Sequence, residues 1–233
     1  MQQSFAYILN QRPFRENSVL VDVFTEDYGR ICCVARPAKK RGKILKGSLE
    51  QFRYLKIQWI GKGNVQTLIE VEEHGRHTMP ASEIMLGLYL NELILLFTSQ
   101  HHSQADLFSA YKYTLHKLGD SLINRHILMR FEMYLLATLG YSLDDNLSPI
   151  NINMRYIFSK ENGLICERLT KGFSLRDKES STQSLYINGK LLVALQDIQQ
   201  MQDSDWKALR IFLDAAFSLL TPRAINTRKL LKI

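Results

Sequence analysis

The sequence predicts an α+β protein in which an N-terminal five-stranded β-barrel of the OB type is followed by a mostly α-helical domain. Apolar residues alternate with polar ones up to about residue 80 and then recur with helical spacing. Positive charge is concentrated between two of the predicted strands. The chain of 233 residues is long enough for two modest domains. We therefore expect a barrel over residues 1–80 and a helical domain over residues 81–233, with a polar, partly irregular insertion at about 142–184.

Five short segments before residue 80 show the alternation that half-buried strands have. The first three have apolar residues at every second position: Phe5, Tyr7 and Leu9, then Val19, Val21 and Val23, then Ile31, Cys33 and Ala35. A hairpin loop at 61–64 joins the last two, whose alternating residues are Leu55, Ile57 and Trp59, then Val65, Thr67, Ile69 and Val71. Five strands of this length match the size of a small OB barrel.

Helical spacing replaces the alternation after Pro80. Ser103 and Asp106 resemble a capping box at the start of a helix, Gly140 is placed as a C-cap, and Pro222 closes the last helix. The polar stretch 142–184 offers only a hairpin, near residues 156–158 and 163–165. The helices expected from the spacing span, in order, about residues 84–95, 103–119, 124–139, 189–198 and 203–219.

The composition is that of an ordinary globular protein, with 45% hydrophobic and 23% charged residues. Charged residues interrupt every hydrophobic segment, so none reaches the ~18 apolar residues that a membrane helix needs. Residues 1–4 lack the basic and apolar regions of a secretory signal. Three cysteines are too few for a disulfide framework, and the adjacent Cys32 and Cys33 point to opposite faces of a strand. We expect a cytoplasmic protein without a bound metal or cofactor.

The positive charge of the chain is confined to one segment. Residues 30–62 contain ten basic residues and one acid, Glu50, and so carry +9, whereas the whole chain carries +7. Five of the basic residues fall within residues 39–46, in a loop that also contains glycine. Like charges at this density repel one another until a polyanion neutralises them, so we expect a site for single-stranded nucleic acid. The alternative is a loop that is merely solvated.

Single strands are held by basic side chains along the phosphates and by aromatic rings against the bases. Tyr54 is the better stacking candidate, because Trp59 shares its strand face with Leu55 and Ile57 and is expected in the core. The C-terminal tail is basic again and gives a second surface. The residues expected to contact DNA are Arg30, Arg36, Lys39, Lys40, Arg41, Lys43, Lys46, Tyr54, Lys56, Arg223, Arg228 and Lys229.

Four motifs follow one another along residues 5–141. The first two are Asp-Val-Phe-Thr-Glu at 22–26 with Tyr-Gly-Arg at 28–30, and Leu-Lys-Gly-Ser-Leu-Glu-Gln-Phe at 45–52. The last two are Gly-Leu-Tyr-Leu-Asn-Glu-Leu at 87–93, and Arg-Phe-Glu at 130–132 with Leu-Gly-Tyr at 139–141. In this order they are similar to motifs of the RecO family of bacterial recombination mediators, and the tail 220–228 resembles that of the family only loosely.

The resemblance implies a non-enzymatic DNA-repair protein of the bacterial cytoplasm that associates with the nucleoid when bound to DNA. Members of the family bind single- and double-stranded DNA and anneal complementary strands coated with the single-stranded-DNA-binding protein (SSB). They also assist RecA loading together with RecR. Some members hold zinc with four cysteines, but the corresponding stretch here has only Cys166, so no zinc is expected.

The SSB tail is acidic with an apolar end, and such a tail needs an arginine beside an apolar pocket. The predicted helix at 124–139 offers this combination. The residues expected to bind the tail are Arg125, Met129 and Arg130, although the family often has two successive arginines where this sequence has Met129 and Arg130. The alternative is that Arg130 only pairs with an acid on a neighbouring helix.

No combination of residues predicts an enzyme. Glu26 with Asp27, and Asp144 with Asp145, are paired acids, but both pairs occupy predicted turns and no third ligand is placed by spacing. The sequence has neither a phosphate-cradling Gly-Lys-Ser/Thr loop nor a nucleophile elbow. The alternative to a recombination mediator is an RNA-binding or ribosome-associated OB-fold module without annealing activity.

Overall fold

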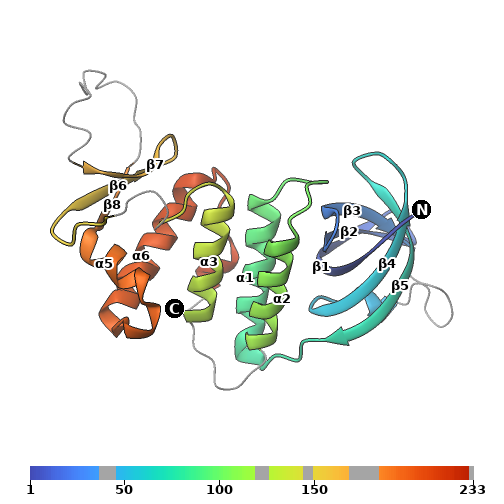
Figure 1. Ribbon diagram of the computed structural model, residues 1–233. Coiled ribbons are helices and arrows are strands. Elements are labelled where there is room, and N and C mark those ends of the chain that lie inside the picture. Colours follow the sequence, from blue (N-terminus) through green and yellow to red (C-terminus); the bar gives the residue numbers. More distant parts are fainter. Residues whose placement is uncertain (37–45, 119–125, 144–148, 168–183, 231–233) are drawn as a thin grey trace. The chain divides into compact units, whose positions relative to one another are not determined.

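A computed structural model describes residues 1–36, 46–118, 126–143, 149–167 and 184–230 (Figure 1). The chain divides into two compact units. One comprises residues 1–123 together with 225–233, and the other comprises residues 124–224. Each unit is described below by itself.

The first unit is built on a closed five-stranded barrel, which confirms the predicted fold class. The strands are β1 (Gln2–Phe14), β2 (Ser18–Thr25), β3 (Gly29–Ala35), β4 (Arg53–Ile60) and β5 (Gln66–Arg76). They are hydrogen-bonded in the order β1-β2-β3-β5-β4, and β1 closes the barrel by pairing with both β2 and β4. The pairing of β3 with β5 is parallel and short, whereas the other pairings are antiparallel.

The barrel interior is filled by side chains from all five strands and from the short 3₁₀ helix η1 (Lys46–Leu49). Trp59 lies in this core, fully buried as the alternation predicted. β5 differs from its predicted alternation, because Leu68 is buried while Val65 and Thr67 are exposed. The cause is a β-bulge: Gln58 pairs with Glu70 and Trp59 with Leu68, so one extra residue of β5 shifts which side chains face inward.

Two helices, α1 (Ala81–Phe97) and α2 (Ala105–Leu118), pack against the outer face of the barrel (Figure 1). β1 uses both faces, because Tyr7 is fully buried outside the barrel and contacts Phe108 and Tyr111 of α2. Asn91 of α1 is buried and donates a hydrogen bond to the Leu9 carbonyl at 3.0 Å. The predicted first and second helices therefore exist, and their apolar sides bury an aromatic face of the barrel.

The last described residues return to α1 within the same unit. The short helix η3 (Thr227–Leu230) packs on α1, and the Glu92 carboxylate accepts hydrogen bonds from the Asn226 and Thr227 backbone N–H groups at 2.8 Å each. The Thr227 hydroxyl also donates to Glu92. A carboxylate that receives two backbone N–H groups caps the first turn of a helix. Glu92 thereby anchors the C-terminal segment.

The second unit combines three helices with a small antiparallel sheet (Figure 1). The helices are α3 (His126–Thr138), α5 (Gly189–Gln196) and α6 (Asp203–Leu220), and α5 leads into the 3₁₀ helix η2 (Ile198–Gln200). The strands are β6 (Arg155–Ser159), β7 (Gly163–Cys166) and β8 (Leu185–Asn188), in the order β7-β6-β8. The hairpin and the helices were predicted. The sequence gave no signal for β8.

A buried ion pair joins α3 to α6. The Arg210 guanidinium donates to both carboxylate oxygens of Glu132, at 2.6 and 2.8 Å, and to Asp214 at 2.7 Å. Glu132 is fully buried, and a buried carboxylate is tolerated only with such a partner. Among the described residues, no helix is long and apolar enough to cross a membrane.

Candidate nucleic-acid interface

The centre of the predicted DNA-binding segment lies outside the described residues. Lys39, Lys40, Arg41 and Lys43 belong to this part, and Lys46 is the first residue of η1. Arg36 follows β3 directly and is exposed. The predicted contacts of these residues with DNA therefore remain predictions.

Arg30 lies within β3, and its guanidinium is used inside the protein. It donates a hydrogen bond to the Thr98 carbonyl at 3.0 Å, just beyond the end of α1. The Arg30 carbonyl in turn accepts from the His101 N–H at 2.9 Å. Arg30 therefore fastens the barrel to the segment between α1 and α2.

Lys56 faces outward from β4 among mixed neighbours. Its partner on β5 is Glu72, and its partner on β1 is Phe5. Directly paired residues share a face of a sheet, so the Lys56 charge lies next to a carboxylate. Glu70 and Glu73 also lie on β5, which makes this strand acidic rather than a continuation of the basic segment.

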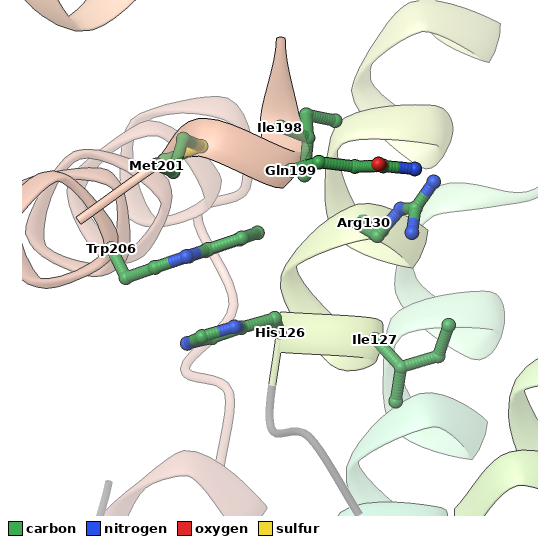
Figure 2. Close-up of a pocket in the computed structure, with 7 residues that line it drawn as sticks. All are labelled: His126, Ile127, Arg130, Ile198, Gln199, Met201 and Trp206. Atoms are coloured by element: carbon green, nitrogen blue, oxygen red, sulfur yellow. The ribbon is translucent and has the colours of Figure 1, made fainter. Parts of the chain in front are cut away.

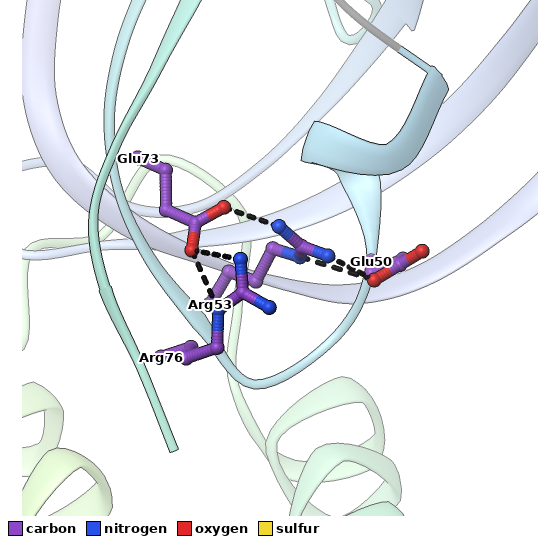
Figure 3. A network of polar contacts seen from close by, with 4 residues as sticks. All are labelled: Glu50, Arg53, Glu73 and Arg76. Carbon is purple, nitrogen blue, oxygen red and sulfur yellow. Dashed lines mark hydrogen bonds and ion pairs between the residues drawn. The ribbon is translucent and has the colours of Figure 1, made fainter. Parts of the chain in front are cut away.

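A network of alternating charges lies where the basic segment enters β4 (Figure 3). Arg53 donates to Glu50 and to Glu73, and Arg76 donates to Glu73 at 2.8 Å. The hydrogen bond with Glu50 is the main cause that raises the pKa of Arg53. Glu50, the one acid of the basic segment, is thus used to fix the start of β4. The two arginines are compensated and add little free positive charge.

The aromatic residues behind the basic segment all have protein partners. The Tyr54 ring stacks on Phe5, with centroids 4.9 Å apart, and the Lys112 ammonium lies 3.9 Å from the Tyr54 ring centre. Phe52 lies against Gly87 of α1, so close that a Cβ at that position would be 2.8 Å from the ring. A base can stack on Tyr54 only if it displaces one of these neighbours.

Two arginines that the sequence did not single out lie near Arg36. Arg12 and Arg15 lie in and beside the hairpin that joins β1 to β2, and the start of β2 pairs with the end of β3. Their nearness to Arg36 follows from strand register, because more than 20 residues of chain separate them. No local pattern in the sequence reveals it.

The C-terminal basic residues have different surroundings. Arg223, in the second unit, and Lys229, in the first, are exposed. Arg228 donates a hydrogen bond to the Tyr89 hydroxyl at 2.8 Å, and its guanidinium lies 5.6 Å from the centre of that ring. Arg228 therefore holds the C-terminal segment on α1.

Arg130 projects from α3 between two cavities of the second unit. The first has a volume of about 340 Å³ and is lined by His126, Ile127, Arg130, Ile198, Gln199, Met201 and Trp206 (Figure 2). The His126 ring stacks on Trp206 with centroids 3.7 Å apart, and burial lowers the pKa of His126. The second, of about 230 Å³, is lined by Arg130, Met133, Tyr134, Ala137, Ser142, Leu143, Leu195 and Ile198.

The predicted tail-binding residues differ in their access to these cavities. Arg130 is exposed and makes no ion pair with any residue that the structure describes. The neighbouring acid Glu132 is instead paired with Arg210. Met129 is buried, so it supports the helix from inside, and Arg125 lies outside the described part of the chain.

Two family models match consecutive parts of the chain. "Recombination protein O N terminal" matches residues 1–76, and "Recombination protein O C terminal" matches residues 82–210. The chain belongs to the RecO family. The RecO of Dechloromonas aromatica is 33% identical over 97% of this chain and 93% of its own length. The RecO of Coxiella burnetii is 31% identical over 97% and 96%, and that of Aromatoleum aromaticum is 34% identical over 70% of each.

These relatives are each named DNA repair protein RecO. The two RecO models meet between residues 76 and 82, where strands give way to helices, although α1 and α2 pack with the barrel. The RecO-like motif at 87–93 contains Asn91 and Glu92, which bind the barrel and the C-terminal segment. Within the described residues, no group of three or more His, Cys, Asp or Glu side chains is placed to hold a metal ion.

Proposed function

We propose that this RecO chain is a non-enzymatic mediator of DNA repair and recombination. It binds single- and double-stranded DNA, anneals complementary strands coated with SSB, and assists RecA loading together with RecR. The observation that carries the proposal is the coincidence of RecO membership with a +9 segment in a barrel. The electrostatic role follows from this charge, because neutralising the phosphates of two strands lowers the repulsion that slows their pairing.

The DNA contacts of this proposal centre on residues 36–46, with Lys56 beside them. Arg223 and Lys229 are exposed and supply further positive charge, each within its own unit. Arg30, Tyr54 and Arg228 already bind protein groups, so they support the interface from behind more readily than they contact DNA.

The SSB tail is proposed to bind at Arg130. An acidic peptide needs a cation, and its apolar end needs a pocket. Arg130 supplies an exposed guanidinium, and the cavity beside Met133, Leu143 and Leu195 supplies an apolar wall. Met129 supports this wall from the buried side of α3.

The test is annealing of complementary SSB-coated strands by the purified protein. We expect annealing that is faster than the spontaneous reaction and that falls as salt rises. A filter-binding competition between single-stranded DNA and RNA accompanies it. Equal preference for RNA, together with no annealing, would support the RNA-binding alternative instead.

A further inference from the structure

The hairpin between β1 and β2 lies at the rim of the barrel where the basic segment begins. Phe14 pairs with Ser18 across the hairpin, and Val19 pairs with Ala35 at the end of β3. Two strand spacings therefore separate Phe14 from the chain next to Arg36, a distance of about 10 Å.

The hairpin between β4 and β5 belongs to the same rim. Val34 pairs with Thr67, and Thr67 pairs with Ile60 on the other side. The loop that carries Lys62 therefore starts beside the end of β3. In OB barrels, the β1–β2 and β4–β5 loops are the ones placed to touch an oligonucleotide.

Cations outnumber acids at this rim. The described charged residues there are Arg12, Arg15, Glu16, Asp22, Arg36 and Lys62. Asp22 is almost buried and accepts a hydrogen bond from Arg12 at 3.0 Å, while the Arg12 side chain remains 53% exposed. Arg15, Arg36 and Lys62 are exposed, so the rim presents net positive charge to solvent.

Phe14 and Arg15 form a ring and cation pair at the tip of the hairpin. The Arg15 guanidinium carbon lies 5.2 Å from the centre of the half-buried Phe14 ring. Arg15 has φ of 55°, a left-handed conformation that is uncommon outside glycine and that turns its side chain toward the ring. An aromatic ring beside a cation is the combination that single-strand binders use for base and phosphate.

Other rings of the barrel do not offer this access. Trp59 is inside the barrel, Tyr54 is covered by Phe5 and Lys112, and Phe52 lies on α1. Tyr28 is partly exposed, but it precedes β3, so the seven residues of that strand place it about 20 Å from Arg36.

We propose that the tip of the β1–β2 hairpin contacts single-stranded nucleic acid directly. Phe14 stacks on a base, and Arg15 and Arg12 bind the adjoining phosphates. This inference rests on the proposed DNA binding and adds to it the element that reads the base face.

The experiment compares two oligonucleotides of equal length, one of thymidines and one abasic. In Phe14→Ala, the Kd for the thymidine strand should rise about fivefold or more, the least that one lost stack amounts to, while the Kd for the abasic strand stays within about twofold. Arg15→Gln should weaken both strands and lower the salt slope by about 0.7. Tyr113→Ala is the matched control, because that exposed ring on α2 also has a cation near it, Lys117 at 5.9 Å.

The outcomes separate this inference from the proposed function. If the wild-type protein binds the thymidine strand and Phe14→Ala binds both strands as the wild type does, the hairpin proposal is wrong and DNA binding stands. Equal weakening of both strands by Phe14→Ala also rejects base stacking. If the wild-type protein binds neither strand, the proposed DNA binding fails and the hairpin proposal fails with it.

Discussion

Asn91 and Glu92 are neighbours on α1 that tie together segments far apart in the sequence. Asn91 donates to the Leu9 carbonyl of β1 and accepts from the Tyr111 hydroxyl of α2. Glu92 caps the segment at 226–227. Both belong to a motif that resembles the RecO family, so this motif has a structural explanation that involves no contact with DNA.

Single residues also separate the proposed partner site from the DNA site. Replacing Arg130 by Ala should weaken binding of an SSB tail peptide about tenfold, because one hydrogen bond to a charged group is worth about 1.5–3 kcal/mol. Binding of naked DNA should stay nearly intact. Titration calorimetry with the peptide and anisotropy with DNA measure the two. Arg223→Ala, an exposed arginine of the same unit, is the control; equal loss of peptide and DNA affinity in Arg130→Ala would reject the assignment.

His77 gives the barrel a pH-dependent stability. Burial, with His116 and Lys112 nearby, lowers the pKa of His77 to about 4, and the ring nitrogen Nε2 is 2.8 Å from the Tyr7 hydroxyl. Because the unfolded state takes up the proton first, the free energy of unfolding should fall as pH drops from about 6.5 to about 4. Urea midpoints at both ends of this range should differ less in His77→Gln than in the wild type. An identical difference in the two proteins would contradict this role.

At the scale of elements, the strands and helices have separate duties. The barrel strands bury their inner side chains in the core, and β1 and β2 bury Tyr7 and Phe24 against α2 on the outside. Little of the described outer surface that α2 covers is left for bases. Positive charge is instead presented by loops: the β1–β2 hairpin, the β4–β5 hairpin and the segment after β3.

The basic segment after β3 should therefore control the salt dependence of DNA binding. Changing Lys39, Lys40 and Arg41 together to Ala should weaken binding at all sequences alike, and should reduce the slope of log K against log salt by about 2, since each phosphate contact contributes about 0.7. Anisotropy titrations over a range of salt concentrations measure the slope. The control removes three exposed lysines of the second unit, Lys160, Lys190 and Lys207. An unchanged slope in the first variant would mean that DNA is bound elsewhere.

At the scale of the whole molecule, the order of the chain differs from the order of its packing. The second unit, residues 124–224, is inserted between α2 and the C-terminal segment, both of which belong to the first unit. The barrel, α1, α2 and η3 thus share one set of contacts, although the family models divide the chain between residues 76 and 82.

The packing predicts how fragments behave. A fragment of residues 1–80 lacks α1 and α2, so Tyr7 and Phe24 become exposed, and each large apolar side chain returned to water costs about 1.5–3 kcal/mol. We expect it to have a lower urea midpoint than a fragment of residues 1–123 and to bind a hydrophobic dye. Equal stability of the two fragments, followed by circular dichroism, would show that the barrel is independent of the helices.

The sequence by itself determined the barrel strands, most helices, the basic segment and the family likeness. Each of these depends on residues close together in the chain, such as the alternation around Ile57 or the charges of residues 39–46. The β-bulge in β5 and the strand β8 escaped prediction, since register and short strands depend on partners elsewhere.

Only the tertiary structure decided which outward side chains are free. Tyr54 and Arg228 look accessible in the sequence, but Lys112 and Tyr89 occupy them, from 58 and 139 positions away in the chain. Arg12 and Arg15 look unremarkable, yet strand pairing brings them beside Arg36. Periodicity fixes which face a side chain takes, whereas the contacts that cover that face come from distant residues.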